Sequence, residues 1–254
     1  AGRSRSDAQG ALGLSGRGEM PRFFADIIDF PGASIEDPSS VRHITGPLRR
    51  REGDELAVRV GDQGYLARIS SIRAGRITLE LVSEEELRDR CSRAVHLALC
   101  LVDLKDFEEA LRPVTELGAA DIHPVVSRRA SVRSVTTARF SRWQAIILEA
   151  VKQCERKTVP VIHCPIDLPD LVRGPSRAWG GKLFALRDGG RALSAGDAGD
   201  VGIIIGPEGG FTDEEILLMR SAGFAAVSMG RTTLRAVTAA VAAVGVLGLE
   251  TGNI

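Results

Sequence analysis

Residues 203–220 read IIIGPEGGFTDEEILLMR, and this stretch decides the fold class. The apolar run 203–205 predicts a buried strand, and Thr212 with Glu215 forms a T-x-x-E capping box, which opens a helix. Open α/β sheets bind their ligands at the carboxyl ends of the strands, where such strand-to-helix turns lie. The stretch therefore predicts an α/β domain with a candidate ligand site at residues 206–210.

The composition of this turn restricts its ligand. A dinucleotide fingerprint needs G-x-G-x-x-G near the start of the α/β unit, and neither the spacing nor the C-terminal placement fits. A P-loop needs a Lys that the turn lacks, while Pro207 removes an N–H group and Glu208 adds negative charge. The turn suits a neutral or cationic ligand held by backbone groups, such as a nucleoside that carries a sulfonium. A tight turn without any ligand stays open on this motif alone.

A second stretch repeats the pattern of a strand, a glycine-bearing loop and a helix. Residues 227–240 read VSMGRTTLRAVTAA, which predicts a strand, a glycine at position 230, a short loop and a helix rich in small residues. Two glycine-bearing loops from adjacent strands can enclose one small molecule between them. The two loops together therefore predict one pocket.

The C-terminal part of the chain alternates between strand and helix patterns. Residues 96–102 form a nearly continuous apolar run, as expected for a strand that is covered on both faces. Further strands are predicted at 121–127, 159–165, 182–188, 200–206 and 225–230, and helices at 106–118, 138–157, 212–223 and from about residue 234. This alternation predicts a mainly parallel sheet with helices on both sides.

The N-terminal part has a different rhythm, in which short strands alternate with turns. Strands are predicted at 21–28, 54–60, 65–72 and 76–82, with the GDQG of residues 61–64 as a hairpin turn. Several strands at this spacing predict a small β-barrel.

These patterns divide the chain into four parts. Residues 1–19 are rich in Gly, Ser, Arg and Ala and lack the apolar core of a signal peptide, so we expect a disordered extension, native or added. The barrel is expected over 20–82, a polar linker over 83–95 and the α/β domain over 96–254.

The charge balance excludes a strongly basic protein. Lys plus Arg number 33 and Asp plus Glu number 33, so no overall positive field indicates a nucleic-acid partner. Nearly all the basic residues are Arg, however, whose guanidinium binds phosphates and stacks on bases, so local Arg clusters can still form an RNA face. A GC-rich genome is the alternative explanation. No apolar run approaches the length that crosses a bilayer, so no membrane partner is expected.

The cysteines form neither a C-x-x-C pair nor a regular framework. A zinc site from Cys154, His163 and Cys164 is conceivable, but its spacing differs from the usual zinc knuckles. We therefore expect reduced, mostly buried thiols in a cytoplasmic protein, and no metal.

At this point the chain resembles a known family, the RsmE family of ribosomal RNA small subunit methyltransferases, in the SPOUT superfamily. The resemblance is carried by IGPEGGFTDEE at 205–215, a strand ending in Met-Gly, and LRAVTAA at 234–240. It extends to MPRFFADI at 20–27, RHITGPLRRREGD at 42–54, TELGAADIHPVVSRRA at 115–130 and RWQAIILEAVKQCERKTVPVI at 142–162. The match therefore covers Met20 to about Leu249.

The resemblance implies a fold and an activity. The fold is a C-terminal SPOUT-type α/β domain with a trefoil knot, preceded by a small PUA-like β-barrel for RNA, in a homodimer with each pocket near the subunit interface. The activity is methylation of N3 of a uridine in the 16S ribosomal RNA of the small subunit, with S-adenosylmethionine as the donor and no metal. Because N3 carries a proton, the site must help that proton leave or stabilise the resulting anion.

The resemblance also assigns residues. Arg235 is the candidate for positioning the base and stabilising its negative charge, and it is not a general base because Arg stays protonated. The residues assigned to the methyl donor are Leu186, Gly206, Pro207, Glu208, Gly209, Gly210, Met229, Gly230, Leu234, Arg235 and Thr238. The candidate RNA contacts are Arg22, Arg49, Arg50 and Arg51 on the barrel, and Arg128, Arg129, Gln153 and Arg156 on the α/β domain.

One segment departs from the family. The family usually reads L-R-T-E-T-A where residues 234–239 read LRAVTA, so Ala236 and Val237 replace a hydroxyl and a carboxylate. Either this change weakens the activity, or Val237 faces the core and the change is tolerated. The alternatives to the N3-methyltransferase are a non-catalytic RNA-binding or ribosome-assembly protein with the same fold, and a SPOUT methyltransferase that acts on another RNA position.

Overall fold

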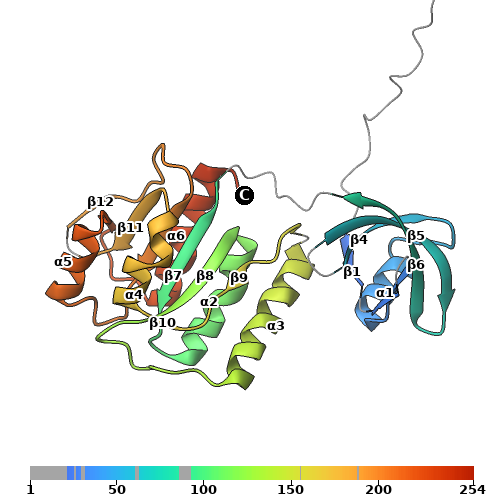
Figure 1. Ribbon diagram of the computed structural model, residues 1–254, viewed down its shortest axis with the longest axis horizontal. Helices are drawn as coiled ribbons and strands as arrows, with labels where there is room; N and C mark the ends of the chain where they lie inside the picture. Colours follow the sequence, from blue (N-terminus) through green and yellow to red (C-terminus); the bar gives the residue numbers. More distant parts are fainter. Residues whose placement is uncertain are drawn as a thin grey trace, which may run out of the picture. The chain divides into compact units, whose positions relative to one another are not determined.

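The structure is a computed structural model in which the chain divides into two compact units, residues 1–86 and 87–254 (Figure 1). The residues whose structure is described are 22–25, 27–29, 32–60, 63–85, 93–154, 156–187 and 189–254. The expected extension at 1–19 lies outside the described residues, as does most of the expected linker at 83–95.

The first unit forms one sheet within its described residues. Its strands are β1 (Arg22–Phe24), β2 (Ile27–Asp29), β3 (Gly32–Ile35), β4 (Glu55–Val60), β5 (Gln63–Arg73) and β6 (Arg76–Glu85). Their order is β1-β4-β5-β6-β3-β2, in which β1 and β4 are parallel and the other neighbours are antiparallel. The strands predicted at 54–60, 65–72 and 76–82 are confirmed, and β6 continues to Glu85, into the segment expected to be a linker.

A short helix in this unit was not predicted. Helix α1 (Pro38–Thr45) begins after Asp37, whose Oδ2 accepts a hydrogen bond from the Ser40 backbone N–H at 2.9 Å. An Asp followed by Pro at the first helical position is a helix-start signal, so the sequence carried the information. Ile44 of this helix is fully buried in the core of the unit, together with Ile35 and Ile77.

The second unit is built on a parallel sheet. Within the described residues its strand order is β10-β8-β7-β13-β11-β14-β12, with β9 paired to β8. The strands are β7 (Val95–Cys100), β8 (Ala119–Val126), β9 (Val161–Ile162), β10 (Ile166–Asp167), β11 (Gly181–Ala185), β12 (Arg191–Ala192), β13 (Val201–Ile205) and β14 (Ala225–Ser228). Every paired strand in this sheet is parallel, as predicted.

Helices cover both faces of this sheet (Figure 1). They are α2 (Leu104–Glu116), α3 (Thr137–Cys154), α4 (Leu168–Arg173), the 3-10 turn η1 (Pro175–Ala178), α5 (Asp213–Ser221) and α6 (Ala236–Thr251). Side chains of α4 and α5 share one core with Ala98 and Ile204, which come from β7 and β13. Because side chains alternate along a strand, Leu97 and Ile203 face the opposite side, where α6 contacts both strands.

Most predicted elements of the second unit are confirmed, with bounds that differ by a few residues. The missed elements are β10, α4, η1 and β12, which are short. A period of 3.6 or 2 cannot be recognised over two to six residues, and prolines interrupt the region from 165 to 175. Among the described residues, no helix is both long enough and apolar enough to cross a membrane.

Candidate ligand pocket

The turn after β13 has a backbone that requires glycine. Gly210 has φ of +69°, and its N–H donates a hydrogen bond of 2.8 Å to the Pro207 carbonyl. A Cβ on Gly206 would lie 2.8 Å from Cε2 of the buried Phe211 ring. A side chain at Gly206 would therefore displace this ring.

The predicted capping box closes the turn and begins α5. The Thr212 hydroxyl accepts from the Glu215 N–H at 3.3 Å, and Glu215 Oε2 accepts from the Thr212 N–H at 2.8 Å. Glu215 is 5% exposed, and its Oε1 accepts a further bond of 2.8 Å from the Arg128 N–H. The carboxylate therefore joins two segments, the start of α5 and the loop after β8.

A second contact joins the loop after β8 to the same turn. The Arg129 Nη1 donates a hydrogen bond to the Gly209 carbonyl oxygen. Together with the Glu215 bond to Arg128, this contact fixes one outer side of the glycine turn. Sequence analysis placed these two arginines among candidate RNA contacts but did not anticipate that they lie against the turn.

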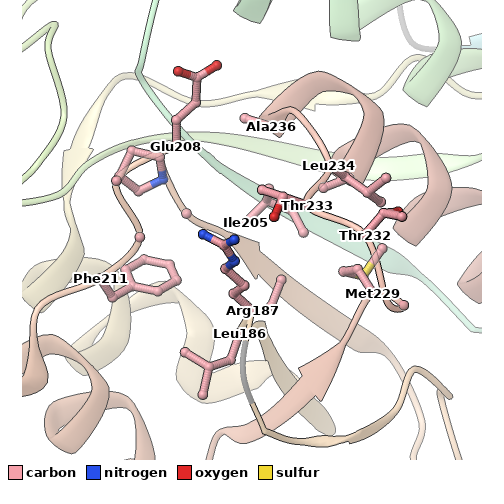
Figure 2. Close-up of a pocket in the computed structure, with 17 residues that line it drawn as sticks. Leu186, Arg187, Ile205, Glu208, Phe211, Met229, Thr232, Thr233, Leu234 and Ala236 are labelled. Atoms are coloured by element: carbon pink, nitrogen blue, oxygen red, sulfur yellow. The ribbon is translucent and has the colours of Figure 1, made fainter.

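The glycine turn forms one wall of a cavity of about 260 Å³. We call this cavity the glycine-turn pocket; it lies where β11, β13 and β14 end at the carboxyl edge of the sheet. It is lined by Ala185, Leu186, Arg187, Ile205, Gly206, Pro207, Glu208, Gly209, Gly210, Phe211, Met229, Gly230, Thr232, Thr233, Leu234, Ala236 and Ala239. Figure 2 shows Leu186 and Arg187 on one side and Met229, Thr232 and Leu234 on the other.

The cavity brings together most of the residues assigned to the methyl donor by the resemblance. Those in its lining are Leu186, Gly206, Pro207, Glu208, Gly209, Gly210, Met229, Gly230 and Leu234. Arg235 and Thr238 are exposed and are not in the lining. The Arg235 side chain lies beside Glu109 of α2, with Nη2 at 3.9 Å from Oε1, and both side chains are largely exposed.

Sequence analysis missed other lining residues. Ala185 is the last residue of β11, and Arg187 follows Leu186 in the loop after it, so the end of that strand was the signal that could have found them. Thr232 and Thr233 belong to the loop already recognised after β14. Phe211 lines the pocket because of a tertiary contact: its buried ring packs edge-to-face with Phe184, at a centroid distance of 6.2 Å.

The two residues that depart from the family lie in different surroundings. Ala236 lines the pocket at the first position of α6. Val237 is 6% exposed and belongs to the buried face of that helix. This burial agrees with the second alternative considered above, in which Val237 faces the core.

The candidate RNA residues fall into several environments. Arg49, Arg51, Arg128, Arg129 and Gln153 are exposed, whereas Arg50 has a buried Nε; the side chain of Arg22 lies outside the description. Arg156 has an internal role that sequence analysis missed. Its Nη1 donates bonds of 2.8 Å to the carbonyl oxygens of Thr115 and Ala119, so it joins the end of α2 to β8.

Backbone groups and apolar side chains form most of the pocket lining. Among its lining residues only Arg187 and Glu208 carry charge, and none offers a thiol or an imidazole. Figure 2 shows the Arg187 guanidinium directed into the cavity, whereas the Glu208 carboxylate points away from its centre. The lining therefore provides mainly binding contacts, and Glu208 is its one carboxylate.

Comparison with known proteins identifies the family to which this chain belongs. A family model described as an RNA methyltransferase domain matches residues 89–248, which hold the parallel sheet and the pocket. The chain is 32% identical over 212 residues to ribosomal RNA small subunit methyltransferase E of Synechocystis, a match that covers 79% of this chain and 68% of the relative. The chain belongs to the RNA methyltransferases, and within them to the ribosomal RNA small subunit methyltransferase E family.

Two solved structures resemble most of the chain. One is a methyltransferase from Legionella pneumophila in complex with the bound cofactor SAM, with a TM-score of 0.72, 29% identity, and coverage of 91% of this chain and 97% of that one. The other is ribosomal RNA small subunit methyltransferase E from Neisseria gonorrhoeae bound to S-adenosylmethionine. Its TM-score is 0.68 and its identity 30%, with coverage of 89% of this chain and 95% of that one.

Proposed function

We propose that this protein methylates N3 of a specific uridine in the 16S ribosomal RNA of the small subunit, with S-adenosylmethionine as the methyl donor. The observation that carries the proposal is the glycine-turn pocket. Both glycine-bearing loops that sequence analysis paired open into this one cavity, and two similar structures bind S-adenosylmethionine.

The lining fits the chemistry of that donor. Adenine is flat and apolar on its faces, and Leu186, Ile205 and Leu234 offer apolar contacts, while the turn offers backbone N–H and carbonyl groups at Gly206 to Gly210. The donor also carries a carboxylate, for which the Arg187 guanidinium is the cationic partner in the lining. S-adenosylmethionine supplies the methyl group that is transferred.

The base-positioning role of Arg235 is part of this proposal. Arg235 precedes Ala236 and follows Leu234, both of which line the pocket, so we expect its guanidinium to reach the pocket mouth in another rotamer. The pair with Glu109 is exposed and 3.9 Å long, so little free energy opposes that rotation. A guanidinium there stabilises the negative charge that develops on the uracil oxygens when N3 loses its proton.

A variant pair tests the role of Arg235. Arg235→Ala is expected to lower kcat by about 100-fold, the scale of one lost charge-stabilising donor, and to leave the Kd for S-adenosylmethionine within threefold. Arg231→Ala is the matched control, since Arg231 is exposed on the same loop and outside the lining. Equal kcat values for the two variants would remove Arg235 from the mechanism.

The finer features of the fold belong to the same proposal. We expect the first unit to be a PUA-like barrel that binds RNA through Arg49, Arg51 and neighbouring residues, and the second to hold a trefoil knot near the pocket. We also expect a homodimer, which the exposed Val246 and Leu249 on α6 support. Sedimentation of the purified chain tests the dimer, and a single 27 kDa species would exclude it.

The activity has a direct test. Purified protein, S-adenosylmethionine and small subunits from a strain that lacks this gene are incubated, and the 16S ribosomal RNA is analysed by mass spectrometry. The proposal expects one new 3-methyluridine. A methyl group at another position favours a methyltransferase of different specificity. Donor binding below detection by calorimetry, with RNA binding retained, favours the non-catalytic RNA-binding or assembly protein.

A further inference from the structure

Three of the four histidines of the chain gather around one carboxylate in the second unit. We call His96, Asp121, His123 and His163 the histidine cluster. Asp121 Oδ2 lies 2.7 Å from His96 Nδ1, and Asp121 Oδ1 lies 2.9 Å from His163 Nε2. The His123 ring stacks on the His163 ring with a centroid distance of 4.0 Å. Both carboxylate oxygens therefore have an imidazole partner.

The cluster lies away from the glycine-turn pocket. His96 is the second residue of β7, Asp121 is its register partner on β8, and His163 follows β9. The pocket instead begins where β13 ends, at the carboxyl edge of the sheet. None of the four cluster residues lines that pocket. The methyl-transfer proposal therefore makes no use of them.

The donor set is that of a transition-metal site. One ligand atom each from Asp121, His123 and His163 can be chosen so that all three lie within 4.8 Å of one another. Two imidazole nitrogens and one carboxylate oxygen suit zinc, which is usually held by four ligands in a tetrahedron. We propose that Asp121, His123 and His163 bind one zinc ion, with water as the fourth ligand.

The distances show which parts of the site must move to bind an ion. Two ligand atoms of a tetrahedral zinc, each about 2.0–2.1 Å from the ion, are separated by about 3.3 Å. The 2.9 Å between Asp121 Oδ1 and His163 Nε2 needs to open by only a few tenths of an ångström to reach that value. The ring planes of His123 and His163 are 2° apart, so one ring must turn for both nitrogens to face a single ion.

His96 supports the carboxylate from the other side. It contacts the Asp121 oxygen that is not paired with His163, and its ring stacks on Trp179 at 5.6 Å with planes 6° apart. A histidine or carboxylate that holds a ligand in this way raises metal affinity. His96 is a positioning residue in this proposal, with Asp200 Oδ2 at 4.0 Å from its other ring nitrogen.

The surroundings allow an ion to enter. The Asp121 side chain is 25% exposed and the His163 side chain 39% exposed, so solvent reaches the ligand atoms from one side. The carboxylates of Asp121 and Asp200 place negative charge near this opening. A bound ion would link β8 to the segment after β9.

Calorimetry on the full-length chain tests the proposal. The protein is freed of any affinity tag, dialysed against a chelator and titrated with Zn²⁺ at pH 7.5. One site per chain is expected, with a rise in the melting temperature, because a ligand that binds the folded state stabilises it. Mg²⁺ is expected not to bind, since it prefers oxygen ligands. Zn²⁺ titration without heat or melting shift would overturn the proposal.

Variants separate this site from adventitious binding. His163→Gln removes a partly exposed ligand and is expected to weaken Zn²⁺ binding by at least tenfold, and His96→Gln by about tenfold. His43→Gln, at an exposed histidine of the first unit, and Cys164→Ala, next to His163, are controls that should leave the affinity unchanged. Binding that survives His163→Gln, or is lost in Cys164→Ala, would contradict the proposed ligand set.

Discussion

Different kinds of chemical group form the two sites on this parallel sheet. At the carboxyl ends of the strands, the glycine-turn pocket is made mostly of backbone, glycine and apolar side chains. The histidine cluster has two members in the amino-terminal halves of β7 and β8, His96 and Asp121, and it is made of ionisable side chains that contact one another. The first end owes its shape to main-chain turns, and the second owes its chemistry to side chains. Substitutions in the glycine-turn pocket therefore act by filling space that the glycines leave open. Substitutions at the histidine cluster act by removing ligand atoms or by disturbing the packing around them.

The largest effect is expected from filling the space under Trp179, beside the cluster. A Cβ on Gly202 of β13 would lie 2.0 Å from Trp179 Cε3, so Gly202→Ala forces the ring that stacks on His96 to move. The expected loss is about 3 kcal/mol in the free energy of unfolding, the upper range for overpacked cores. Urea unfolding measures it. Gly199→Ala is the control, because a Cβ there meets nothing within 4 Å; equal losses would show that packing on Trp179 is not the cause.

The next effect concerns Glu215, a buried carboxylate that supports the pocket end. Glu215→Gln replaces an acceptor with an amide NH₂ that faces the N–H of either Thr212 or Arg128. The expected loss is about 2 kcal/mol in the free energy of unfolding, as for hydrogen bonds to a charged group. Thermal and urea unfolding provide the measurement. Glu214→Gln, at an exposed position in the same turn of α5, should change stability by less than about 0.5 kcal/mol.

A smaller change is expected from the glycine turn itself. Gly206→Ala places a Cβ 2.8 Å from the Phe211 ring and deforms the pocket wall. The affinity for S-adenosylmethionine is expected to fall about tenfold, equivalent to about 1.4 kcal/mol. Calorimetry on the folded variant measures this, with Gly199→Ala as the matched glycine control. An unchanged Kd would mean that the donor does not depend on this wall.

The smallest expected effect is a difference in reactivity between two cysteines, one near each site. Burial raises the pKa of the Cys100 thiol, at the end of β7, to about 12, so Cys100 stays protonated at pH 8. Cys164, beside His163, is exposed. Alkylation of the native protein at pH 8, located by mass spectrometry, is expected to modify Cys164 and to spare Cys100. Rapid modification of Cys100 would show that the pocket end opens in solution.

Much of the fold could be predicted from local pattern. The capping box of Thr212 and Glu215 forms as expected, and the apolar run from His96 becomes the buried strand β7. Helix α4 was missed because six residues with a proline carry no readable period. Helix α1 was missed although Asp37 and Pro38 carry a start signal, because a strand-and-turn rhythm dominated that region.

The outline of the pocket and part of its lining could be predicted, but some of the lining residues could not. The two glycine loops were recognisable because glycine-rich turns mark themselves in sequence, and both line one cavity. Arg187 was not recognised, since its place depends on β11 lying between β13 and β14. The role of Arg235 stays a prediction, because its side chain lies beside Glu109 and outside the lining.

The sequence by itself determined the alternation of strands and helices, the glycine turn and the family, because each rests on contiguous residues and short-range periodicity. The tertiary structure decided which distant residues meet. His96, Asp121 and His163 are separated by 25 and 42 residues along the chain, and nothing local relates them. They come together because β8 pairs with both β7 and β9 in parallel register. Glu215 reaches Arg128, 87 residues away, for the same reason: contacts between elements are set by sheet order and packing.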